Sequence, residues 1–174
     1  MKMISKIIML SVVLLTGCKK ENIPRTSGTD TIDNMIYKST IYYVYGFSFT
    51  KAGKVPTTAT PGPDFVLYAN PDTIRLNLQA INLKDSFSKV DDYPDAASSI
   101  KAFKNLTTVG SVQWITMADP VEANQIWLYR TNDDKYAKIR IVTTVYKILD
   151  SQIYGQITFE WLFQPDGSYT FLAE

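Results

Sequence analysis

The clearest strand signal lies near the end of the chain, in residues 157–167, which read Ile157-Thr158-Phe159-Glu160-Trp161-Leu162-Phe163-Gln164-Pro165-Asp166-Gly167. Large apolar side chains occupy every second position from Ile157 to Phe163, which is the pattern of a strand with one buried face. Asp166-Gly167 is typical of a hairpin turn and predicts a further short strand over Tyr169–Leu172. This stretch therefore predicts antiparallel sheet at the end of the chain.

The same alternation of apolar and polar residues recurs upstream. It predicts further strands over residues 41–49, 64–69, 73–80, 111–116, 125–130 and 135–148. Between the first two, Lys51 to Pro63 contains Pro56, Pro61 and Pro63, and prolines cannot donate to a regular ladder, so we expect a loop. Short turns between successive strands imply mostly antiparallel pairing.

One segment is predicted to be helical. Tyr93-Pro94-Asp95 opens it, with a proline near the first turn and an acidic residue that the helix dipole favours. Apolar residues then follow at spacings of three, at Ala97, Ile100, Phe103 and Leu106. The sequence therefore predicts a β-dominated α+β domain, with mostly antiparallel sheets and one main helix near residues 94–107.

The N-terminal segment has the pattern of an export signal. Residues 1–17 combine a short basic start with an apolar run that is too short to span a bilayer. Leu15-Thr16-Gly17-Cys18 resembles a bacterial lipobox, which implies cleavage before Cys18 and attachment of lipid to it; the alternative is an ordinary secretory signal whose cysteine is incidental. Because the following residues are polar, we expect a flexible tether over residues 18–34 and a folded domain over residues 35–174.

The residues after Cys18 bear on localisation. Lys19, Lys20 and Glu21 follow it, with no aspartate, and by resemblance to bacterial sorting patterns this favours the outer membrane. The sequence leaves open whether the protein faces the cell surface or the periplasm.

Composition excludes several classes of function. The 174 residues contain 18 Lys and Arg against 17 Asp and Glu, without the basic surface that nucleic-acid binding needs. There is no histidine and a single cysteine, so the commonest general base and metal ligand are missing and thiolate zinc cages are excluded. No phosphate loop, nucleophile elbow or metal-spaced cluster is present. We expect a protein that is not an enzyme.

The C-terminal third to half of the chain resembles the HmuY-like haem-binding lipoproteins. The resemblance lies in two stretches, Ile126-Trp127-Leu128-Tyr129-Arg130-Thr131-Asn132-Asp133-Asp134-Lys135-Tyr136-Ala137-Lys138-Ile139-Arg140-Ile141 and residues 157–168. One position departs from the family pattern, because Asp134 stands where the turn usually has glycine. The resemblance implies a β-rich domain that takes up haem for iron acquisition and passes it to a TonB-dependent outer-membrane receptor.

The resemblance also implies where the haem iron would be held. The best-known members use two axial histidines, which this chain lacks, and some use methionines. Met117 lies about where the second ligand of the family is carried, and a thioether is an admissible iron ligand. The other ligand loop should fall near residues 83–95, where Tyr93 is the candidate. Met35 is a poorer candidate, and each of these residues has an ordinary packing role as its alternative.

Other parts of a haem pocket have candidates that a core or a solvated surface would equally use. Trp114, Trp127, Tyr129 and Phe103 are candidate walls, and Arg130, Lys138 and Arg140 are candidate partners for the propionates. The alternative function is a haem-free surface module that binds a partner protein or a glycan. For a partner, the contact site would be the sheet edge near Phe47–Phe49 or the loop 51–64.

Overall fold

A long antiparallel hairpin organises the chain. Strand β9 (Tyr136–Leu149) pairs with β10 (Gln152–Gln164) from Tyr136↔Gln164 to Leu149↔Gln152, with one irregularity in register between Thr158 and Phe159. The computed structural model describes residues 25–36, 44–82, 84–149 and 152–171. The predicted strand 135–148 and the strand predicted from Ile157 to Phe163 both lie within this hairpin.

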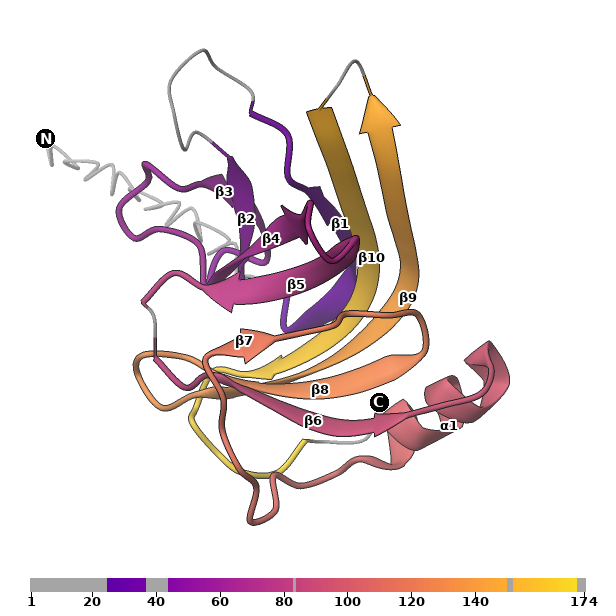
Figure 1. Cartoon of the computed structure of the whole chain (residues 1–174). Helices are drawn as coiled ribbons and strands as arrows, with labels where there is room; N and C mark the ends of the chain where they lie inside the picture. The colour runs from indigo at the N-terminus through magenta and orange to yellow at the C-terminus, as the bar shows by residue number, and fades with distance from the viewer. Residues whose placement is uncertain (1–24, 37–43, 83, 150–151, 172–174) are drawn as a thin grey trace, which may run out of the picture.

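Two antiparallel five-stranded sheets pack face to face (Figure 1). The first has the order β1-β10-β9-β8-β6, with β1 (Ser27–Asp33), β6 (Phe87–Asp92) and β8 (Gln125–Arg130). The second has the order β3-β2-β4-β5-β7, with β2 (Tyr45–Ser48), β3 (Gly53–Pro56), β4 (Phe65–Asn70), β5 (Arg75–Ala80) and β7 (Met117–Ala118). The prediction of a β-dominated α+β domain with mostly antiparallel sheets is confirmed.

The core lies between the two sheets and is rich in aromatic side chains. The buried face of β10 carries the residues that the alternation predicted, namely Ile157, Phe159, Trp161 and Phe163. From the second sheet, the Phe47 ring lies 5.0 Å from the Phe159 ring, edge to face, and 5.2 Å from the Trp161 ring. Such geometries add to the free energy that area burial alone supplies.

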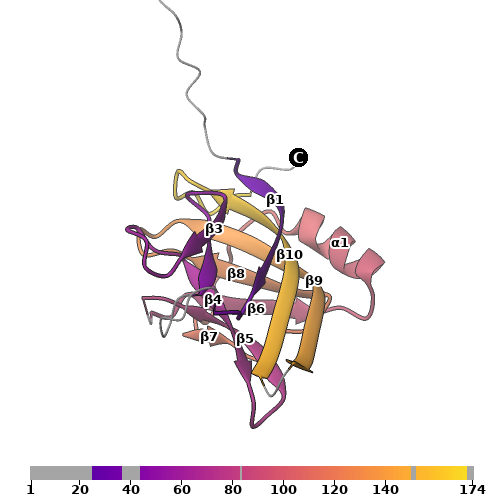
Figure 2. The same cartoon turned by 90° about the horizontal axis from the view of Figure 1, so that it is seen from above.

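Helix α1 (Ala96–Asn105) covers the other face of the first sheet, against β8 and β9 (Figure 2). Asp95 caps its N-terminus by accepting a hydrogen bond of 2.7 Å from the Ser98 amide. Phe103 is buried, whereas Ile100 is 38% exposed and Ser99 is buried in its place. The helix is confirmed, but its apolar stripe is narrower than predicted.

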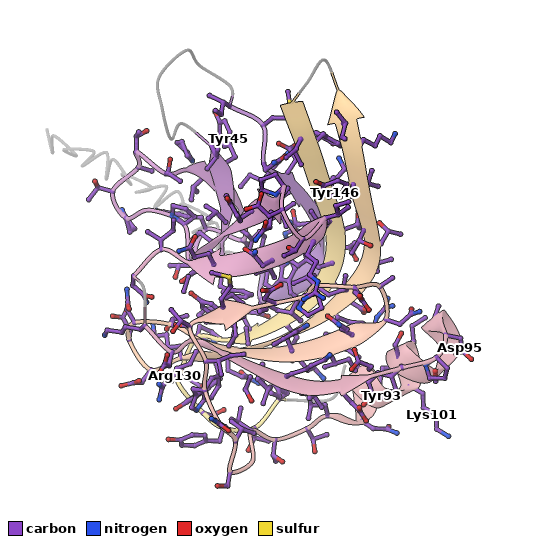
Figure 3. All side chains as sticks on the ribbon, viewed as in Figure 1. Tyr45, Tyr93, Asp95, Lys101, Arg130 and Tyr146 are labelled. Carbon is purple, nitrogen blue, oxygen red and sulfur yellow. The ribbon has the colours of Figure 1, made fainter. Side chains whose placement is uncertain are left out.

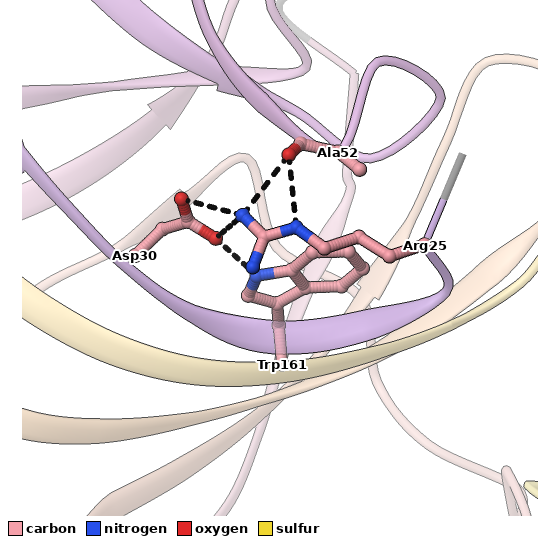
Figure 4. A network of polar contacts seen from close by, with 4 residues as sticks. All are labelled: Arg25, Asp30, Ala52 and Trp161. Atoms are coloured by element: carbon pink, nitrogen blue, oxygen red, sulfur yellow. Dashed lines mark hydrogen bonds and ion pairs between the residues drawn. The ribbon is translucent and has the colours of Figure 1, made fainter. Parts of the chain in front are cut away.

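The predicted tether is wrong for residues 27–33, because these form β1 and pair with β10 from Ser27↔Leu162 to Asp33↔Gln156. Residues 25 and 26 also belonged to the predicted tether, and they lie directly before this edge strand. Arg25 donates hydrogen bonds to the Asp30 carboxylate and to the Ala52 carbonyl, and Asp30 also accepts one of 2.8 Å from the Trp161 indole (Figure 4). β1 is polar because it is an edge strand, of which only Ile32 and Asp33 are buried.

Several smaller predictions need correction. The predicted loop 51–63 contains β3, which pairs with β2, and the predicted ligand loop 83–95 contains β6. In the predicted strand 111–116 the structure has only an isolated bridge from Ile115 to Phe87, and after Tyr169 only one from Thr170 to Thr108. The predicted strand 41–49 is described from Val44 onward, where β2 begins at Tyr45. The signal segment 1–17 and Cys18 lie outside the described residues.

Gly46 in β2 allows a close approach between β2 and the start of β4. A Cβ atom at Gly46 would lie 2.6 Å from the Pro63 Cβ and would also meet the Phe65 carbonyl oxygen. At Gly53 in the neighbouring β3, the nearest atom to such a Cβ would be 4.0 Å away. The two glycines therefore differ in the space available for a side chain.

We predict that Gly46→Ala lowers the free energy of unfolding by about 1–3 kcal/mol, because the extra methyl group forces the two strands apart. The matched control Gly53→Ala should change it by less than about 1 kcal/mol. Urea denaturation of both variants measures the difference. Equal effects of the two substitutions would contradict the close approach.

Candidate functional site

The outer face of the second sheet carries an apolar groove with a volume of about 520 Å³. We call this the apolar groove and define it by its lining residues, Asn34, Ile36, Val44, Thr57, Val66, Leu67, Tyr68, Gln79 and Ile81. Its volume lies within the range of roughly 300–1,000 Å³ typical of small-molecule sites. The groove is therefore large enough for a small organic ligand.

The groove exists because β4 is apolar on both faces. Phe65, Leu67 and Ala69 point into the core, while Val66 and Tyr68 point outward. Tyr68 is 49% exposed, and from flanking segments Ile81 is 43% and Ile36 is 59% exposed. The solvent-facing side of an antiparallel sheet is normally polar, so these exposed apolar side chains form an unusual surface.

Met117 lies beside this groove. It pairs with Gln79 of β5, which in turn pairs with Val66 of β4. Directly paired residues project from the same face of a sheet, so Val66, Gln79 and Met117 form one row across three strands. With about 4.8 Å between strands, Met117 is about 10 Å from Val66 along that row. Met117 is not among the residues that line the groove.

Tyr93 does not lie near the apolar groove or Met117. It follows β6 at the edge of the first sheet and lies beside α1 (Figure 3). Burial and the nearby Asp91 carboxylate raise the pKa of Tyr93, so the phenolate needed for iron ligation is disfavoured. Met117 lies in β7 of the second sheet, whereas Tyr93 follows the end of β6 in the first sheet, so the structure does not bring the two predicted haem ligands together.

The other residues predicted to form the walls of a haem pocket pack within the protein instead. Trp127, Tyr129 and Phe103 are buried, and Arg130 lies over the half-buried Trp114 ring at 4.9 Å. None of these residues lines the apolar groove.

The cations predicted to bind propionates are also engaged elsewhere. Lys138 is 3% exposed and donates to the carbonyl oxygens of Phe103 and Leu106, at 2.6 and 3.0 Å, where α1 ends. Arg140 is buried and forms an ion pair of 2.8 Å with Glu160. Their alternative interpretation as a solvated strand face is wrong, because α1 covers that face.

A second, polar pocket of about 380 Å³ lies where β2, β5 and β8 end. We call this the polar pocket. Its polar lining comes from Ser48, Thr50, Asp64, Asn82, Tyr129, Thr131, Asn132, Asp133 and Lys135, and Pro61, Gly62, Pro63 and Ile81 complete the wall. Ile81 belongs to both pockets.

Asp64 is the most perturbed carboxyl group in this pocket. Its Oδ2 accepts a hydrogen bond of 2.8 Å from the Phe49 amide, and its backbone amide donates to the Phe47 carbonyl, which extends the short contact between β2 and β4. Burial raises the pKa of Asp64 to about 6 against the lowering effect of the hydrogen bonds from the Phe49 amide and the Ser48 side chain, and the Asp133 carboxylate adds to the increase. Asp64 therefore titrates near neutral pH.

Comparisons with protein-family models, with curated proteins and with solved structures find no match for this chain. Within the part of the chain that the structure describes, no three acidic or cysteine side chains converge to hold a metal ion. Among the same residues, no helix has the length and apolar character to span a membrane. The two pockets are therefore the candidate sites of this chain.

Sequence reasoning missed both pockets, although one signal was present. In the predicted strand 64–69, Val66 and Tyr68 occupy the face opposite Phe65 and Leu67, so both faces of the strand are apolar. A strand at a solvent-facing surface with two apolar faces indicates a covered or ligand-binding surface.

We predict that Asp64→Asn removes one pH dependence of stability. Because the folded-state pKa of Asp64 is raised above 3.8, the folded chain binds this proton more tightly, and the resulting stabilisation is complete below pH 4 and is lost as the pH rises through 6. The asparagine variant lacks this loss. Its unfolding free energy relative to wild type should therefore increase by up to about 3 kcal/mol between pH 3 and pH 7.

Urea denaturation at a series of pH values measures this difference. The exposed Asp72 provides the control, because Asp72→Asn should follow the wild-type profile. Parallel profiles for wild type and Asp64→Asn would show that the carboxyl group titrates normally.

Proposed function

We propose that this chain is a lipid-anchored binding protein of the bacterial outer membrane that holds an apolar ligand, of the kind and size of haem, in the apolar groove. The observation that carries the proposal is the set of exposed apolar side chains that line the apolar groove of about 520 Å³ on the second sheet. A ligand in this groove would remove Ile36, Tyr68 and Ile81 from water, which is a favourable change.

The lining fits the apolar part of a porphyrin better than its iron or its propionates. Valine, isoleucine and tyrosine side chains are suitable walls for a flat hydrocarbon ring. No lysine or arginine is among the described residues that line the groove, and the predicted ligand pair Met117 and Tyr93 does not assemble. The proposed binding therefore depends on the apolar ring of the ligand and not on its iron.

The anchor and the receptor belong to the same proposal. Lipid attached to Cys18 would hold the protein at the outer membrane, on its surface or its periplasmic face. A TonB-dependent receptor would accept the ligand from the groove. An open groove suits such a transfer, because the ligand is reached from solvent without unfolding of the core.

An alternative occupant is a partner protein, which the separation of Met117 from Tyr93 favours. The exposed Ile36, Tyr68 and Ile81 would then pack against side chains of the partner. A glycan is less well supported, because Trp127 and Trp161 are buried in the core and do not present a surface on which a sugar could stack.

We predict that Val66→Asp weakens porphyrin binding about tenfold or more, because it places a charge on the apolar wall. The measurement is a fluorescence and absorbance titration of residues 19–174, which contain every described element, with haemin and with metal-free protoporphyrin. Both should bind in a saturable manner and with similar affinity. The control Ile148→Ser alters an isoleucine that is 73% exposed and does not line the groove, so it should leave both affinities unchanged.

The outcomes separate the candidate functions. Haemin binding that exceeds protoporphyrin binding and is lost in Met117→Leu would show iron ligation by that thioether. Absence of saturable binding to either compound would reject the porphyrin ligand and direct the search to a partner protein. Equal weakening by Val66→Asp and Ile148→Ser would place the ligand elsewhere.

A further inference from the structure

The polar pocket has a chemical character different from that of the apolar groove. Loop residues before β4 and the turn that joins β8 to β9 enclose its volume of about 380 Å³. Hydroxyl, amide and carboxyl groups provide most of its lining, with Ile81 and three loop residues as the remainder. A ligand that fits here must therefore exchange hydrogen bonds with the wall.

The Asp64 carboxylate has neutral donors only. The Phe49 amide donates to it at 2.8 Å and the Ser48 hydroxyl provides a second hydrogen bond. Among the described residues, no lysine or arginine forms an ion pair with Asp64. Asp64 is half-buried, so its ionised form is partly desolvated and would be stabilised by a positive charge that enters the pocket.

The charges of the lining favour a cationic ligand. Asp64 and Asp133 are both acidic, and Lys135 is the one basic residue among the described lining. The Asp133 carboxylate contributes to the raised pKa of Asp64. With both carboxylates ionised, the lining has one negative charge in excess.

Neutral groups at the mouth supply hydrogen bonds for the rest of a ligand. Asn82 donates its amide hydrogen to the Asn132 side-chain oxygen, which joins the β5 end to the β8–β9 turn. The Thr131 hydroxyl accepts from the Lys135 amide at 3.1 Å, and its own proton is available to an acceptor. Such side chains suit a ligand with several hydroxyl groups.

We propose that the polar pocket binds a small hydroxylated primary amine, whose ammonium group pairs with Asp64 and Asp133 and whose hydroxyl groups bond to Asn132 and Thr131. This site is separate from the apolar groove and does not depend on the function proposed for it. The ammonium group offsets the charge of the half-buried Asp64 carboxylate, and the hydroxyl groups of the ligand bond to the amide and hydroxyl side chains.

The test is an NMR titration of ¹⁵N-labelled residues 19–174 with glucosamine at pH 7, with glucose and N-acetylglucosamine as uncharged counterparts. Glucosamine should shift the amide signals of Phe49 and Thr131 in a saturable manner, and the two uncharged sugars should bind about tenfold more weakly. Asp64→Asn and Asp133→Asn should each weaken glucosamine binding by a similar factor. The control Asp72→Asn, outside the pocket, should leave it unchanged.

The pH dependence provides a second readout. Binding of glucosamine should weaken from pH 7 to pH 5 as Asp64 takes up a proton, with Asp133, Lys135 and Tyr129 as the other titratable groups that line the pocket. Asp64→Asn should abolish most of this dependence. Asp133 is exposed in a turn, so Asp133→Asn tests the proposal even if the Asp64 variant is unstable.

Two outcomes would overturn the proposal. Equal affinity for glucosamine and glucose would show that the ammonium group contributes nothing and that the pocket accepts neutral sugars. Absence of saturable shifts at millimolar glucosamine would show that the pocket does not bind this class of ligand.

Discussion

The contact of Phe47 with β10 holds the two sheets together. Its ring touches Phe159 and Trp161 of the first sheet while its backbone provides the one paired contact of β2 with β4. Gly46 beside it allows β4 to approach. The inner faces of both sheets are therefore buried against each other. Ligands can reach only the outer surfaces and the strand ends, and both pockets lie there.

The elements that sequence reasoning predicted best are those whose large apolar residues are buried. β10 was predicted from Ile157 to Phe163, and β8 was predicted with its observed bounds, because their apolar residues all face a core. β1 was missed because an edge strand needs little apolar surface, and its anchoring depends on Arg25 and Trp161, which are distant in sequence. β6 was missed because only its first two residues are buried.

The candidate site was harder to predict, because its residues meet only after folding. The sequence places Met117 before β8, and only the register through Gln79 shows that it shares a face with Val66. The alternation of charges around Lys138 predicts a solvated strand face, but α1 covers that face and buries Lys138. Asp134 in the turn between β8 and β9 has a φ of 53°, in the left-handed region that glycine adopts most readily, which the sequence alone does not reveal.

The Arg25 contacts hold the start of β1 against Ala52 of the second sheet's β2–β3 connection and against Asp30 (Figure 4). Seven peptide steps separate Cys18 from Arg25 and span at most about 25 Å. In an acylated chain, a pull between membrane and domain would therefore pass through Arg25 into β1. Asn34, which follows β1, bonds to the backbone of Ile153 and Gly155 and lines the apolar groove. Tension on the proposed anchor would thus reach Asn34 at the rim of the groove, so that the proposed attachment point and the proposed ligand site would be linked through one strand.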